Sequence, residues 1–78
     1  MTEHHIYDEY KGFRMWNYMT CEKSEEGRET WRINVEIKRG EEIVIPVVVG
    51  TDSYVDRGYA QKAGKELGIK LVDEAGIS

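Results

Sequence analysis

The chain has 78 residues, a net charge of −4 and 40% apolar residues. A chain of this length buries only about 60–65% of its unfolded surface, enough for one small domain. We therefore expect a single α+β domain over residues 1–78, with residues 1–5 and 74–78 flexible. The longest apolar run, residues 43–49, is broken by Pro46 and is too short to cross a bilayer, so no membrane contact is expected.

The only cysteine, Cys21, excludes an intrachain disulfide, and no signal peptide is visible. Together these features predict a cytoplasmic protein. The acidic balance argues against nucleic-acid binding, because phosphate neutralisation supplies most non-specific affinity. Residues 11–40 nevertheless carry seven basic and five acidic residues, a net of +2, which keeps nucleic acid as an alternative partner.

Three segments have the character of β-strands. Apolar and polar residues alternate without a fault over residues 31–38, the period of a strand with one buried face. Residues 11–22 are rich in aromatic residues and threonine, which favour strands. Residues 6–10 form a weaker candidate for a strand that precedes these two.

A hairpin loop is predicted at residues 25–27, with Gly27 in the left-handed conformation. This loop sets Ser24 opposite Arg28 and defines the register of the two strands. The predicted core face is then Phe13, Met15, Asn17, Met19, Cys21, Trp31, Ile33, Val35 and Ile37. A slip of one residue, which would turn Trp16 and Tyr18 inward, is the alternative register.

A second tight turn at residues 39–41 leads into a strand over residues 42–49. Pro46 cannot donate to a ladder, so this strand is expected at an edge or with a bulge. The strand is apolar on both faces, which is unusual beside solvent. We therefore expect either the N-terminal segment or a second subunit to cover it.

One helix is predicted after the sheet, with Ser53 and Asp56 as a variant capping box and Gly68 as its C-cap. Its expected core stripe is Val55, Tyr59, Ala63 and Leu67, widened by Ala60 and Gly64. Ile69, Leu71 and Val72 are expected along the core edge, and the chain is expected to fray from Asp73. The predicted fold is a three-stranded antiparallel meander, or a four-stranded one if an N-terminal strand is added, with a C-terminal helix on one face.

No catalytic, cofactor or metal site is predicted. His4 and His5 lie near Asp8 and Glu9, but adjacent side chains of an extended segment point in opposite directions. Cys21 is interpreted as a buried structural thiol, because its register places it on the core face. No glycine-rich phosphate loop is present. The sequence therefore predicts a protein that is not an enzyme and carries no cofactor.

The remaining signal is the face of the sheet opposite the core. The candidate interaction surface consists of Arg14, Trp16, Tyr18, Arg32, Asn34 and Lys38. Tryptophan, tyrosine and arginine are enriched where proteins meet, and basic and aromatic residues on a sheet also suit nucleic acid. We favour a protein-interaction or regulatory module, self-association included. The alternatives are a weak nucleic-acid binder and an ordinary solvated face with cross-strand charge pairs that involve Glu36.

Two resemblances accompany these features. The chain resembles small bacterial domains of unknown function in three features: a Tyr10-x-Gly12 strand, a strand that begins at Trp31, and the C-terminal motif Gly68-Ile69-x-x-Val72-Asp73. This resemblance implies no activity. Residues 10–14 and 31–37 are similar to the first two strands of the three-stranded DNA-binding domains of the plant AP2 and phage-integrase type. That resemblance places Arg14, Arg32, Asn34 and Glu36 on the DNA-facing side. The third strand departs from the plant pattern, so this resemblance implies a similar fold rather than a similar function.

Overall fold

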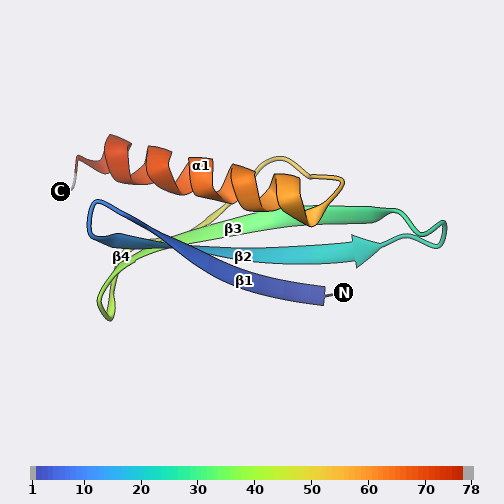
Figure 1. Cartoon of the computed structure of the whole chain (residues 1–78), viewed down its shortest axis with the longest axis horizontal. Coiled ribbons are helices and arrows are strands. Elements are labelled where there is room, and N and C mark those ends of the chain that lie inside the picture. The colour runs from blue at the N-terminus through green and yellow to red at the C-terminus, as the bar shows by residue number, and fades with distance from the viewer. Residues whose placement is uncertain (1, 77–78) are drawn as a thin grey trace.

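The computed structural model, which describes residues 2–76, is a four-stranded antiparallel sheet with one helix across one face (Figure 1). The strands are β1 (Thr2–Tyr10), β2 (Phe13–Lys23), β3 (Glu29–Arg39) and β4 (Glu42–Val49), and they lie in chain order. The helix α1 (Arg57–Ala75) contacts β2 and β3. The predicted α+β meander is therefore confirmed, with an N-terminal fourth strand.

The two chain ends contribute more regular structure than the sequence predicted. Residues 2–5, expected to be flexible, belong to β1, and residues 74–75 belong to the last turn of α1. Residues 1, 77 and 78, which shared that expectation, lie outside the described residues. Within residues 2–76 no helix is long and apolar enough to cross a membrane.

The predicted register of β2 and β3 is confirmed. Cys21 lies opposite Trp31 and Met15 lies opposite Ile37. All nine predicted core-face residues are buried: Phe13, Met15, Asn17, Met19, Cys21, Trp31, Ile33, Val35 and Ile37. The alternative register, with Trp16 and Tyr18 inside, is wrong, because a slip of one residue would have turned Phe13, Met15, Met19 and Cys21 toward solvent.

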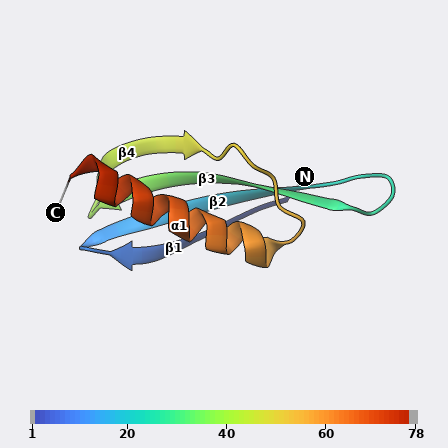
Figure 2. The ribbon, with the colours of Figure 1, turned by 90° about the horizontal axis from the view of Figure 1, so that it is seen from above.

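The β2–β3 loop also has the predicted form. Gly27 has φ 85°, and its N–H donates to the carbonyl of Ser24 at 2.9 Å. The Ser24 N–H donates to the Arg28 carbonyl at 2.9 Å, so these two residues face each other as expected. The hairpin that carries this loop extends past the N-terminal end of α1 (Figure 2).

β4 lies at an edge of the sheet and is irregular, as Pro46 predicted. Val35 faces Val48 while Ile37 faces Ile45, so Glu36 lies opposite two residues, and a second shift follows one residue later. Because β1 lies at the other edge, the N-terminal segment does not cover β4. The prediction that the N-terminal segment covers this strand is therefore wrong, and the prediction that a second subunit covers it stays a prediction.

The predicted start of the helix is wrong. α1 begins at Arg57, and its N-cap is Asp56, whose carboxylate accepts from the N–H of Tyr59 at 3.0 Å. The reason is tertiary: Tyr54 and Trp31 exchange two backbone hydrogen bonds of 2.8 Å. This bridge holds the chain extended just after Ser53, so the helix cannot begin there.

The predicted core stripe of the helix is wrong at two of its residues, because Val55 precedes the helix and Tyr59 is exposed. The rest is confirmed: Ala60 and Gly64 are buried, and Ala63 and Leu67 are half-buried and pack against the core. The fully buried stripe is Ala60, Gly64, Gly68 and Val72, at a spacing of four residues. Small residues occupy most of this buried stripe because they let the helix backbone approach the sheet closely.

Gly68 does not end the helix, contrary to the prediction. It is buried in the fourth turn, where a Cβ would lie 2.9 Å from the Cβ of Met15. The helix continues to Ala75, and Gly76, with φ 66°, supplies the left-handed C-cap. Val72 packs in the core as predicted, although as part of the helix rather than after it.

Asn17 connects the helix to the sheet between two apolar clusters. Its Nδ2 donates to the carbonyl of Ala60 at 3.3 Å, and a Cβ on Gly64 would lie 1.9 Å from that nitrogen. Its Oδ1 is buried and has no partner among the described residues. Gly64 is therefore required by the close approach of a buried polar side chain.

We predict that Gly64→Ala destabilises the fold by about 1–3 kcal/mol, the usual cost of overpacking, although alanine alone favours a helix by about 1 kcal/mol. Urea unfolding measures the change. In an Asn17→Ala background the added methyl group has space, so the same substitution should cost at least about 1 kcal/mol less there. Equal costs in both backgrounds would contradict the proposed contact.

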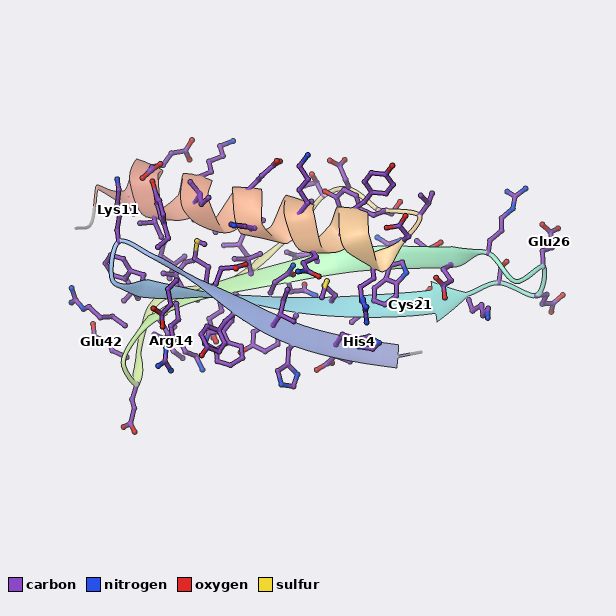
Figure 3. All side chains as sticks on the ribbon, in the orientation of Figure 1. His4, Lys11, Arg14, Cys21, Glu26 and Glu42 are labelled. Carbon is purple, nitrogen blue, oxygen red and sulfur yellow. The ribbon has the colours of Figure 1, made fainter. Side chains whose placement is uncertain are left out.

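The C-terminal turn of α1 is bound to the β1–β2 turn. Asp73 accepts from the Tyr10 hydroxyl at 2.9 Å and from the Lys11 ammonium at 2.9 Å. Figure 3 shows Lys11 reaching up beside this end of the helix. The hydrogen bonds from Lys11 and Tyr10 lower the pKa of Asp73, and the same bond to Asp73 raises the pKa of Lys11.

We predict that Asp73→Asn lowers stability near neutral pH and that the difference from the native chain disappears in acid. A carboxylate whose pKa is lowered by folding stabilises the fold above its unfolded value of 3.8, and the stabilisation is lost as pH falls through the folded value. Urea midpoints at about pH 7 and about pH 2 test this. Glu74→Gln, at an exposed pair with Lys70, is the control and should change little.

Candidate interaction face of the sheet

We define the outer face as the side of the sheet opposite α1. The structure places all six residues of the predicted surface on it: Arg14, Trp16, Tyr18, Arg32, Asn34 and Lys38. Figure 3 shows Arg14 projecting from the sheet on the side away from the helix. No element of residues 2–76 covers this face, since α1 packs on the other side (Figure 1). The predicted residues thus share one open surface.

The centre of the outer face is a cluster of rings. This aromatic cluster consists of His5, Tyr7, Trp16 and Tyr18. Tyr7 and Trp16 are neighbours across β1 and β2, with ring centroids 4.8 Å apart. Trp16 and Tyr18 follow each other along β2 at 6.2 Å, with ring planes 15° apart. His5 lies 6.0 Å from Trp16 and 6.2 Å from Tyr18.

The basic side chains beside the cluster are held by acids of the same chain. The Arg14 guanidinium lies 5.2 Å from the Tyr7 ring centroid and 3.8 Å from the carboxylate of Glu9. The Lys38 ammonium lies 5.8 Å from the Trp16 centroid and 3.4 Å from the carboxylate of Glu36. Both cations therefore cover rings while their charge is matched within the face.

Glu36 is the acid at the centre of this arrangement, and it is only 9% exposed. Its carboxylate accepts from the Tyr18 hydroxyl at 3.1 Å as well as pairing with Lys38. Burial, together with this hydrogen bond and the charge of Glu36, raises the pKa of Tyr18 above 10.0. Glu36 forms a charge pair on this face, but with Lys38 of the same strand rather than across strands as predicted.

The other two predicted residues differ in their contacts. Asn34 donates from its Nδ2 to the carbonyl of Tyr18 at 3.3 Å, so it stiffens the β2–β3 pair. Arg32 is exposed near the end of the face that carries the N-terminus of β1.

β4 adds an apolar row that the predicted surface did not include. Ile43 faces Lys38 and Val49 faces Asn34, so both lie on the outer face, and Val47 is one of the two residues opposite Glu36. These three side chains are 53%, 69% and 49% exposed, a large value for β-branched residues on one strand. The row lies at the β4 edge, and the outer-face side chains of β3 separate it from the aromatic cluster.

Sequence reasoning missed two parts of this face. His5 and Tyr7 were left out because the strand pattern of the N-terminal segment was weak. If the segment is read as a strand, Glu3, His5, Tyr7 and Glu9 lie on one face, since residues two apart share a face. The apolar row was noted as unusual but could not be assigned to a face, because the bulges shift the register by one residue each.

The remaining candidates for chemistry stay apart. His4 and His5 lie on opposite faces, as predicted, and the His4 ring is 5.4 Å from that of Trp31. Cys21 is buried, as predicted. Among the described residues, no three His, Cys, Asp or Glu side chains come together in a way that could hold a metal ion.

Comparison with known proteins adds no relative. No family model, no curated protein and no solved structure matches the chain. The two resemblances noted from the sequence stay predictions.

We predict that Tyr18→Phe costs about 1–2 kcal/mol of stability, because the Glu36 carboxylate loses a hydrogen-bond donor. Tyr7→Phe, an exposed ring of the same cluster, is the control and should change stability by less than about 0.5 kcal/mol. Since the pKa of Tyr18 is raised, its contribution is present below pH 10.0 and is lost as pH rises through the folded value. Ultraviolet titration should show the most alkaline tyrosine step disappear in Tyr18→Phe, and an unchanged curve would contradict the assignment.

Proposed function

We propose that this chain is a non-enzymatic protein-interaction module and that a protein partner docks on the outer face. The observation that carries the proposal is the exposed apolar row of Ile43, Val47 and Val49, which shares with the aromatic cluster a face that no described element covers. The outer-face side chains of β3 lie between the row and the cluster. Exposed apolar residues that adjoin one another are typical of surfaces that bind proteins. Tryptophan, tyrosine and arginine are also the residues that contribute most to such contacts.

The charges of the face support a protein partner over nucleic acid. Nucleic-acid affinity comes largely from basic side chains that neutralise phosphates. Here Arg14 is paired with Glu9 and Lys38 with Glu36, so phosphates would have to compete with carboxylates already in place. The chain as a whole carries a charge of −4, which adds a further repulsion.

The same pairs prepare the face for burial. A charged group that is covered by a partner costs free energy unless it is hydrogen-bonded or paired. Glu36 already has Tyr18 and Lys38 as partners, and it is nearly buried before any partner arrives. An apolar surface can therefore cover the centre of the face without leaving an unpaired charge.

We predict that Val47→Lys abolishes partner binding while the chain stays folded, because Val47 is an exposed edge-strand residue in the middle of the row. The chain is immobilised and exposed to a native lysate, and bound proteins are quantified for each variant. Gln61→Lys adds the same charge at an exposed position of the helix and is the matched control. We expect at least a tenfold loss with Val47→Lys, and none with Gln61→Lys.

Two results would contradict the proposal. One is a set of captured proteins that both variants retain equally. The other is salt-sensitive quenching of tryptophan fluorescence by duplex or single-stranded oligonucleotides, since nucleic acid would then be the partner of the aromatic cluster.

A further inference from the structure

The two edges of the sheet differ in how well they are protected. β4 carries Pro46 and two bulges, devices that prevent another strand from adding to an edge. β1 has nine residues with no proline, and it pairs with β2 without a bulge. β1 is therefore the edge on which a further strand can form a regular ladder.

The β1–β2 turn determines which backbone groups of β1 are free. Lys11 and Gly12 have φ 52° and 83°, the signature of a two-residue type I′ turn. In such a turn the flanking residues, Tyr10 and Phe13, are hydrogen-bonded to each other. Bonded and non-bonded pairs alternate along an antiparallel ladder, so the even-numbered residues of β1 bond to β2. The odd-numbered residues present N–H and C=O groups to the open edge: Glu3, His5, Tyr7 and Glu9.

We propose that β1 pairs antiparallel with β1 of a second copy, around a two-fold axis at Tyr7. The proposal concerns the edge of the sheet and stands independently of the docking proposed for the outer face. A two-fold axis perpendicular to the sheet joins the two meanders into one continuous sheet. Both helices then lie on one side, and both outer faces lie on the other.

The side chains of β1 favour this register among those in which most of the strand overlaps with its copy. Only odd-numbered residues offer backbone groups, so they must face odd-numbered residues of the second copy. With the axis at Tyr7, His5 faces Glu9 of the second copy twice, and no acid faces an acid. With the axis at Ile6, Glu3 faces Glu9 twice, and like charges directly opposite each other are destabilising. With the axis at His5, the two copies of His5 face each other and no histidine faces a carboxylate that could accept a hydrogen bond from it.

The aromatic cluster supports the same axis. Tyr7 is 46% exposed on the outer face, and its ring is 4.8 Å from Trp16. If the two Tyr7 residues face each other, the rings of Tyr7 and Trp16 of the second copy continue the line of rings. The aromatic cluster then extends across the boundary between the copies. Cross-strand aromatic pairs stabilise sheets by about 0.2–1 kcal/mol each. The dimer would thus double the area of the outer face around one aromatic centre.

A second copy fits this edge better than an unrelated strand, because the match of His5 with Glu9 is a property of β1 against itself. An extended segment of another protein needs only the backbone groups. A measurement on the purified chain alone distinguishes the two possibilities, because only a second copy of the chain can then pair with β1. The contact is small, so the dimer should dissociate on dilution.

Sedimentation of the full chain over a range of concentrations tests the proposal. We expect a reversible dimer that His5→Pro converts to a monomer, because proline removes an edge-facing N–H and none from the β1–β2 ladder. His5→Ala keeps that N–H and is the matched control, so its dimer should persist and be weaker by less than about tenfold. Circular dichroism confirms that each variant is folded.

Oxidation of cysteine substitutions made in a Cys21→Ala background, which removes the native thiol, tests the register. His5→Cys, Ile6→Cys and Tyr7→Cys are each oxidised, and Tyr7→Cys should give by far the most covalent dimer, since only its sulfurs face each other. A wild-type chain that is monomeric up to about 1 mM overturns the proposal. A dimer that survives His5→Pro but is lost in Val47→Lys also overturns it, and would assign self-association to the outer face instead.

Discussion

The close approach of α1 to the inner face of the sheet is the contact on which the rest of the structure depends. It is possible because the helix presents Ala60, Gly64 and Gly68 to β2, where Asn17 and Met15 fill the space that larger side chains would occupy. Each helical glycine costs about 1 kcal/mol of helix propensity relative to alanine. The packing compensates for this cost, and the bond from Asn17 to the Ala60 carbonyl gives the helix one preferred position along the sheet.

This packing decides what is left exposed. The one helix packs over β2 and β3 on one face of the sheet, and no described element covers the other face. The outer face is then held together by its own contacts: rings packed on rings, cations over rings and a nearly buried carboxylate with two partners. The result is a rigid surface with matched charges and an apolar margin along β4, which is the basis of the proposed docking.

The edges of the sheet differ from its faces in the groups that a partner can contact. On β4, Pro46 and the bulges limit strand addition, while the outward side chains remain apolar. On β1, the backbone groups are open and the side chains are polar or aromatic. A face is recognised through side chains and an edge through the backbone. The two proposed contacts therefore use separate parts of the molecule and can form at the same time.

Most of the sheet was determined by local patterns. The alternation along residues 31–38 and the loop at Gly27 set the register of β2 and β3, and with it the six predicted residues of the outer face, because side chains alternate with a period of two. Pro46 correctly indicated an irregular edge. The helix depended on distant contacts instead. Its start was set by the bridge between Tyr54 and Trp31, and its buried stripe by the space beside Asn17 and Met15. Local periodicity cannot reveal either of these, because each arises only when segments far apart in the chain meet.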